Sequence, residues 1–234
     1  MATQLDLQEQ EQLDALKAFW NKQGNLITWT LVLALGGFAA WNGWNYWQRE
    51  QGVKAGAMFE DLDRSVTAGY VVKTARVFAD MKERFPGTAF TQQGGLAAAK
   101  LQAAKGQADA AKASLTWVAE HGAEVEVRTI ARLRLAALQT DARQLDEALK
   151  TLDLAQAEGF EALVADRRGD ILMLQGKKDA ARAAYQTAYK TMSEKVDYRR
   201  LIEAKLTAMG ASPGEATSAT GAASAAVTAS GAKP

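Results

Sequence analysis

His121 is the only histidine in the chain, and Glu120, Glu124 and Glu126 lie close to it in the sequence. An imidazole among carboxylates can bind a divalent metal or transfer a proton, because its charge changes near neutral pH. The position of His121 favours a structural role, since it ends an expected helix just before Gly122, where a partly cationic ring is stabilised. We therefore interpret His121 as a helix cap and the glutamates as a solvated turn, and we expect no metal site.

Other residue types that catalyse reactions lack the spacing that an enzyme needs. Ser65, Ser114 and Ser193 have no histidine that their spacing places as a general base. Gly94 and Gly95 have neither the preceding strand nor the G-x-x-x-x-G-K spacing of a phosphate-binding loop. The chain has no cysteine, which excludes a thiol nucleophile and a thiolate metal site. We expect no catalytic residue, no cofactor and no small-molecule substrate.

Charge and proline content narrow the class of protein further. The chain carries 28 basic and 27 acidic side chains, so it lacks the strong positive field of nucleic-acid binders, and we expect no nucleic-acid partner. Its three prolines, Pro86, Pro213 and Pro234, leave residues 1–212 interrupted only once by a residue that helix interiors reject. These features predict an all-α protein.

A long apolar segment near the N-terminus predicts a membrane anchor. Nineteen uncharged residues, LITWTLVLALGGFAAWNGW, run from Leu26 to Trp44. That length is close to the roughly 20 residues that a helix needs to cross about 30 Å of hydrocarbon. Trp41, Trp44 and Trp47 are typical of a membrane interface, where an indole ring is buried among acyl chains while its N–H stays wet. We expect a transmembrane helix over residues 25–47.

The flanking residues favour an anchor that is not cleaved. A signal peptide has a basic start and an apolar core of about 7 to 15 residues, whereas residues 1–24 carry four acidic and two basic side chains. We expect residues 1–24 to form a short polar tail. Gly36, Ala40 and Gly43 lie on one helical stripe, which is either a docking face for another membrane helix or ordinary membrane-helix composition. Lysine and arginine are balanced across the anchor, so charge does not determine its orientation.

A period of 33 residues relates two stretches between residues 132 and 193. Antiparallel helices cross closely only where a side chain is as small as glycine or alanine, and a large residue nearby fills the remaining gap. This pattern is typical of tetratricopeptide repeats. The matched pairs are Ala136 with Gly169, Ala148 with Ala181, Leu152 with Tyr185, and Ala155 with Ala188, and an earlier copy contributes Ala99, Ala111 and Leu115.

The repeats predict an α-solenoid of about four helix pairs over residues 48–209. Residues 51–81 form its first pair with a weaker match, and residues 198–209 form a capping helix, because a stack of repeats needs a terminal element over its last apolar face. Residues 210–234 consist almost entirely of Ala, Gly, Ser, Thr and Pro and are expected to be a disordered tail.

Charged residues on the expected first helices are candidates for partner contacts. The segment from Val164 to Asp170 places four charges around Gly169, and Arg167 can form a salt bridge with Asp170 three residues on. In tetratricopeptide arrays the first helices line a concave groove. We therefore select four residues as protein-binding candidates: Lys100, Asp166, Asp170 and Met173.

Six short segments give the chain a resemblance to a known family: GWNYW at 43–47, ALKTLD at 148–153, EGF at 158–160, VAD at 164–166, RG at 168–169 and GKKDAAR at 176–182. Over residues 1–209 the chain resembles the YfgM family, the ancillary subunits of the bacterial SecYEG translocon. The resemblance implies a non-catalytic protein with one helix in the inner membrane, a cytoplasmic N-terminus and a periplasmic tetratricopeptide-like domain.

The same resemblance implies partners that the residues alone do not indicate. These are the SecYEG translocon, a PpiD-like membrane-anchored chaperone, and periplasmic chaperones that receive translocating polypeptides. The tail at 210–234 departs from the short ending expected of the family. The residues themselves leave an alternative open, in which the anchored solenoid is a scaffold that sequesters or regulates a cytoplasmic partner.

Overall fold

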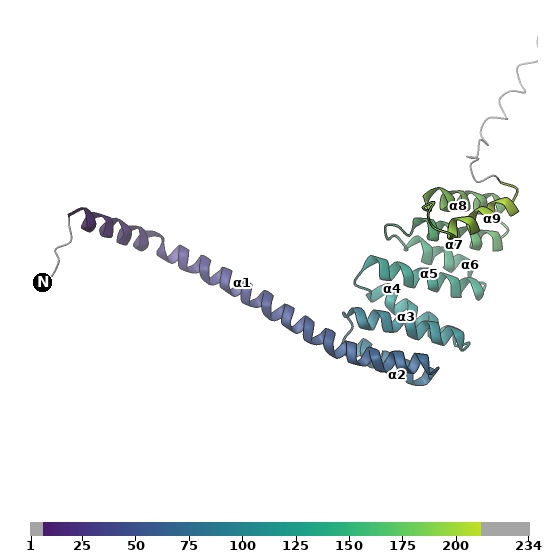
Figure 1. Cartoon of the computed structure of the whole chain (residues 1–234), viewed down its shortest axis with the longest axis horizontal. Coiled ribbons are helices and arrows are strands. Elements are labelled where there is room, and N and C mark those ends of the chain that lie inside the picture. The colour runs from purple at the N-terminus through teal and green to yellow at the C-terminus, as the bar shows by residue number, and fades with distance from the viewer. Residues whose placement is uncertain (1–6, 212–234) are drawn as a thin grey trace, which may run out of the picture. The chain divides into compact units, whose positions relative to one another are not determined.

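The computed structural model describes residues 7–211, and within that range the chain forms nine α-helices and no strand (Figure 1). The expected all-α class is therefore confirmed. Residues 1–6 of the polar tail and residues 212–234 of the C-terminal tail lie outside the described residues. The chain divides after Lys54 into two compact units, of which the first contains the anchor and the second, residues 55–211 of the described chain, is the solenoid.

Helix α1 (Leu7–Thr67) contains the anchor and continues into the first helix of the solenoid without a break. The sequence predicts these as separate elements, but Gly52 and Gly56 cost a helix only about 1 kcal/mol each relative to alanine, and no proline interrupts the run. Within the anchor, the hydroxyls of Thr28 and Thr30 donate to main-chain carbonyls one turn earlier, each at 2.8 Å. These two hydroxyl groups are thus satisfied within the helix.

The anchor has the length and composition to cross a membrane, and no other helix in the described part of the chain does. Trp41, Trp44 and Trp47 are exposed, and the rings of Trp44 and Trp47 lie 5.3 Å apart. A Cβ added at Gly36 or at Gly43 would meet no atom within 4 Å. The small-residue stripe therefore leaves the backbone of this unit open to close approach.

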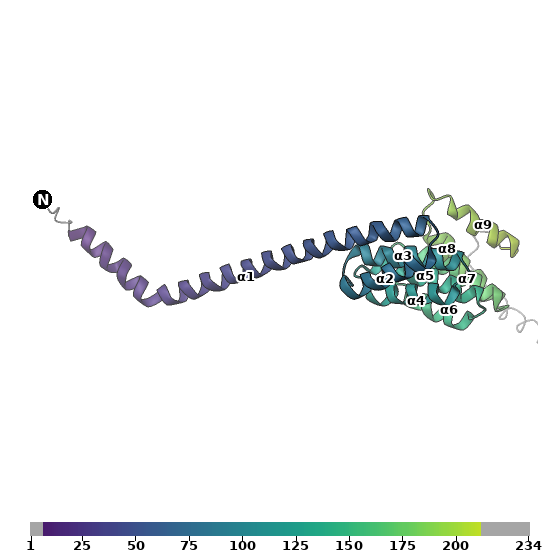
Figure 2. The ribbon, with the colours of Figure 1, turned by 90° about the horizontal axis from the view of Figure 1, so that it is seen from below.

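The solenoid continues with eight further helices that pack in chain order, each against the next (Figure 1). In Figure 2 the first helices of successive repeats, α3, α5 and α7, form one layer, and α2, α4 and α6 form the other. The helices are α2 (Val71–Arg84), α3 (Ala89–Ala104), α4 (Ala108–His121), α5 (Val125–Asp141), α6 (Leu145–Asp153), α7 (Glu161–Leu174), α8 (Lys178–Thr191) and α9 (Tyr198–Ala208).

The small residues of the repeat pattern lie where helices cross. A Cβ added at Gly169 of α7 would lie 2.5 Å from Cε1 of the Tyr185 ring in α8. Outside the matched small positions, a Cβ added at Gly95 of α3 would likewise lie 2.5 Å from Val118 of α4. The alanines of the repeat alignment are all buried. Ala155 is 8% exposed, and the others are at most 2% exposed: Ala99, Ala111, Ala136, Ala148, Ala181 and Ala188.

Local signals end and begin the helices between the repeats. Pro86 disfavours helical backbone at the residue before it, and α2 ends at Arg84. The hydroxyl of Thr88 then accepts a hydrogen bond from the N–H of Thr91 at 3.3 Å and so caps the start of α3. The turns after α3 and α7 use Gly106 and Gly176 at φ 74° and 75°, a left-handed conformation that glycine adopts without a Cβ clash.

Candidate protein-binding surfaces

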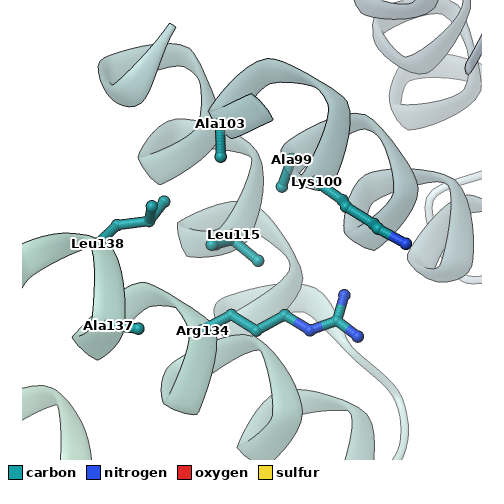
Figure 3. A pocket seen from close by; sticks show the side chains of 7 residues that line it. All are labelled: Ala99, Lys100, Ala103, Leu115, Arg134, Ala137 and Leu138. Atoms are coloured by element: carbon teal, nitrogen blue, oxygen red, sulfur yellow. The ribbon is translucent and has the colours of Figure 1, made fainter. Parts of the chain in front are cut away.

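A hollow of about 420 Å³ lies between the first helices α3 and α5 of two adjacent repeats. Its floor consists of apolar side chains, and two long cationic side chains form part of its wall. Figure 3 shows Lys100 and Arg134 extending toward the same side of it, with Leu115 between them. We call this the Lys100–Arg134 hollow, and its lining residues are Ala99, Lys100, Ala103, Leu115, Arg134, Ala137 and Leu138.

The two cations of this hollow are not neutralised from within the solenoid. Lys100 and Arg134 are both exposed, and the described residues place no carboxylate within salt-bridge distance of either. Lys100 is one of the predicted binding residues, and the structure places it on α3, the first helix of its repeat, where it lines this hollow. Its role in binding stays a prediction.

Asp166 of α7 lies beneath the capping helix and is 2% exposed. Its carboxylate accepts hydrogen bonds from Lys205 Nζ of α9 at 2.8 and 2.9 Å and from the Tyr198 hydroxyl at 2.8 Å. A partner cannot reach this side chain while α9 is docked. The structure thus gives Asp166 an intramolecular contact in place of the exposed position expected for partner binding.

Asp170 extends the same polar cluster toward the surface. Lys205 Nζ and the Tyr185 hydroxyl each donate to Asp170 Oδ1 at 2.7 Å, and Arg167 Nη1 lies 3.9 Å from Oδ2, which confirms the predicted salt bridge. Burial and the hydrogen bond to Asp166 raise the pKa of Tyr198 to about 12. Burial and the bond to Asp170 raise the pKa of Tyr185 further still. Both phenols therefore stay protonated donors at physiological pH.

Asp170 and Met173 line a second hollow of about 450 Å³ between α7, α8 and α9, together with Tyr185, Lys205 and Met209. The long cation of this hollow, Lys205, is already bonded to two carboxylates. The two hollows therefore differ in charge: within residues 7–211, the cations at α3 and α5 have no carboxylate partner, and the cation at α7 to α9 has two.

His121 has the structural role that its position predicts. Its Nδ1 lies 3.0 Å from the main-chain carbonyl of Trp117, and its ring stacks on the Trp117 ring at a centroid distance of 5.0 Å. Arg128 then donates to the carbonyls of Gly122 and Ala123 at 2.7 and 2.9 Å in the following turn. Residues 11–211 contain no group of three side chains placed to hold a metal ion.

Sequence reasoning missed two residues that shape these surfaces, Arg134 and Lys205. Arg134 could have been found, since the 33-residue period aligns it with Arg167, which lies in the charged segment around Gly169. Lys205 lies 39 residues after Asp166 in a helix outside the repeat period. No spacing rule in the sequence joins those two positions.

Comparison with known proteins agrees with this architecture. The family model described as "Tetratricopeptide repeat-like domain" matches residues 17–211. A protein of Haemophilus influenzae named "Ancillary SecYEG translocon subunit" is 30% identical over 190 residues, which cover 80% of this chain and 92% of the relative. A protein of Escherichia coli with the same name is 30% identical over 186 residues, which cover 78% of this chain and 88% of the relative.

A third relative with that name, from Neisseria gonorrhoeae, is 24% identical over 201 residues, covering 86% of this chain and 96% of its own. The family match spans both the anchor and the solenoid, since the family model begins at residue 17 and ends at residue 211. The chain therefore belongs to the tetratricopeptide repeat-like family that contains the ancillary SecYEG translocon subunits, the YfgM family.

Proposed function

We propose that this protein is a membrane-anchored, non-catalytic adaptor that binds other polypeptides at the SecYEG translocon. The observation that carries the proposal is the combination of a helix able to cross a membrane with a repeat solenoid in one chain, in a family whose named members are ancillary translocon subunits. The Lys100–Arg134 hollow supports a binding role, because it is an apolar depression on the first helices of the repeats.

In this proposal the anchor lies in the bacterial inner membrane. Residues 1–24 lie in the cytoplasm and the solenoid lies in the periplasm. The partners are the translocon, a PpiD-like membrane-anchored chaperone, and translocating polypeptides that pass to periplasmic chaperones. Lys100, Asp170 and Met173 contact partners from the groove side of the repeats.

Tethering explains how such an adaptor works with weak contacts. A binding surface held close to its target experiences a high effective concentration, so that each contact needs only modest intrinsic affinity. Gly36, Ala40 and Gly43 support close docking of the anchor on another membrane helix, because a Cβ at either glycine meets nothing within this unit.

Protease accessibility tests the orientation on which this function depends. We expect protease added to intact spheroplasts to digest the solenoid and leave a fragment of the anchor and N-terminal tail. A cytoplasmic protein assayed in the same sample should stay intact, which controls for lysis. Protection of the solenoid until the spheroplasts are lysed would contradict the proposal and would support the cytoplasmic scaffold instead.

A further inference from the structure

The floor of the Lys100–Arg134 hollow is built for an apolar side chain. Ala99, Ala103 and Ala137 supply methyl groups, Leu115 is 2% exposed at the base, and Leu138 closes one side. A volume of about 420 Å³ falls within the range of roughly 300 to 1,000 Å³ typical of ligand sites. A leucine-sized side chain that enters the hollow buries apolar surface on both partners.

The wall of the hollow is built for negative charge. Lys100 and Arg134 come from different repeats, yet their side chains extend toward the same side (Figure 3). An apolar occupant alone would leave both cations without a partner and partly desolvate them, which is unfavourable. A carboxylate beside the apolar side chain would meet both cations and complete the site.

The next repeat differs, because its cations are paired with carboxylates of the same chain. The repeat alignment places Lys100 at the same position as Asp170, and Arg134 at the same position as Arg167. Arg167 Nη1 lies 3.9 Å from Asp170 Oδ2, and Lys205 Nζ lies 2.7 Å from Asp170 Oδ1 and 2.8 Å from Asp166 Oδ1. The described residues place no carboxylate at such a distance from Lys100 or Arg134. The positive charge at α3 and α5 is therefore a local property of one hollow.

We propose that the Lys100–Arg134 hollow binds a polypeptide segment in which a leucine-sized side chain lies next to a carboxylate. This inference rests on the proposed adaptor function and specifies the chemistry of its partner segment. The apolar side chain fills the floor over Leu115, and the acidic group accepts hydrogen bonds from Lys100 and Arg134. A nucleic acid would not fit this chemistry, because the hollow offers two cations over an apolar floor and the whole chain carries a net charge of only +1.

Fluorescence anisotropy with short labelled peptides tests the proposal on the full-length protein in detergent micelles. Four probes share one Gly-Ser framework and carry Leu-Glu, Leu-Gln, Leu-Lys or Ser-Glu pairs. We expect the Leu-Glu peptide to bind at least about tenfold more tightly than each of the other three, and its affinity to fall as salt is added. Equal affinity for the four probes, or no binding of any, would overturn the proposal.

Two sets of variants assign the binding to this hollow. The double variant Lys100→Glu/Arg134→Glu should bind the Leu-Glu peptide with about tenfold lower affinity than the parent. It should bind the Leu-Lys peptide more tightly than the Leu-Glu peptide. Ala137→Phe should weaken Leu-Glu binding by filling the floor while it leaves both cations in place. The control Lys150→Glu/Lys190→Glu changes the same number of exposed charges on the second helices α6 and α8 and should bind like the parent.

The outcomes separate this inference from the adaptor function on which it rests. If Lys150→Glu/Lys190→Glu lowered the affinity for the Leu-Glu peptide as much as Lys100→Glu/Arg134→Glu does, net charge alone would explain the binding. That result would overturn the inference. The probe series on the unmodified protein measures the peptide preference by itself, even if a variant folds poorly. Copurification of the parent chain with the translocon reports the adaptor function separately, since it does not depend on peptide preference.

Discussion

Gly169→Leu is expected to lower the free energy of unfolding of the last repeat by about 3 kcal/mol, the upper end of what overpacking usually costs. A Cβ at this position would lie 2.5 to 2.9 Å from three atoms of the Tyr185 ring. The ring cannot easily move, because its hydroxyl is fixed to Asp170 at 2.7 Å. Leucine has a helix propensity that is more favourable than that of glycine by roughly 1 kcal/mol, so propensity alone would stabilise the variant. A measured loss of stability would therefore come from the steric clash.

Urea unfolding of the full-length chain in detergent, followed by helical circular dichroism, measures this change. Gly87→Ala is the matched control, since a Cβ there would meet nothing within 4 Å and should change stability by no more than about 1 kcal/mol. A Gly169→Leu variant as stable as the parent would contradict the close crossing of α7 and α8. It would also remove the physical basis for the repeat alignment.

Lys205→Met is expected to cost about 3 kcal/mol in the stability of the capping helix. Among the described residues, the substitution removes the only cation that contacts the carboxylate of Asp166, which is 2% exposed, and leaves that charge with one hydroxyl donor. Breaking a buried ion pair on one side typically costs about 3 to 5 kcal/mol, whereas replacing both partners with apolar side chains is often nearly neutral. The double variant Asp166→Leu/Lys205→Met should therefore regain most of the lost stability.

Hydrogen exchange of α9 in the full-length chain measures this effect where it arises, because a solenoid can open locally at its end. Arg168→Met is the control, since its pair with Asp153 is 2.6 Å long but its side chains are 36% and 58% exposed, and it should contribute less than about 1 kcal/mol. Unchanged protection of α9 in Lys205→Met would show that the buried cluster does not hold the capping helix.

The same cluster gives the capping helix a dependence on alkaline pH. In the folded chain, burial and Asp166 raise the pKa of Tyr198 from an ordinary value of 10.0 to about 12. The unfolded chain therefore releases this proton first as pH rises, so the stabilising contribution is full below pH 10 and is lost between about pH 10 and 12. The protection of α9 should fall across that interval.

The all-α class was predicted from the low proline content, and the stack of helix pairs was predicted from the repeat period. The crossing residues repeat because each pair of helices faces the same steric constraint, and so Gly169 and Ala181 could be found from spacing alone. The continuity of α1 was not predicted, although Gly52 and Gly56 weaken a helix by only about 1 kcal/mol each and do not end it. A Cβ added at Gly56 would lie 3.3 Å from the Phe90 ring, so α1 and α3 approach closely at this glycine.

The candidate surfaces were predicted less well, because they depend on contacts between distant residues. Lys100 lines a hollow, but its neighbour Arg134 comes from the next repeat. Asp166 was predicted to contact a partner, but it is buried and its carboxylate binds Lys205 of α9 instead. The 33-residue period identifies equivalent positions in successive repeats. It does not predict which of these positions the capping helix α9 buries.

Photocrosslinking within the membrane tests most directly whether the anchor holds the solenoid beside the translocon. A photoreactive residue is placed at Gly36 or Gly43 on the small-residue stripe, and at Phe38 on the opposite face of the helix as the matched control. We predict adducts with a SecYEG subunit from Gly36 and Gly43 that are much stronger than from Phe38. The absence of translocon adducts from all three positions, in cells where the full-length chain is in the membrane, would contradict the proposed placement of the solenoid.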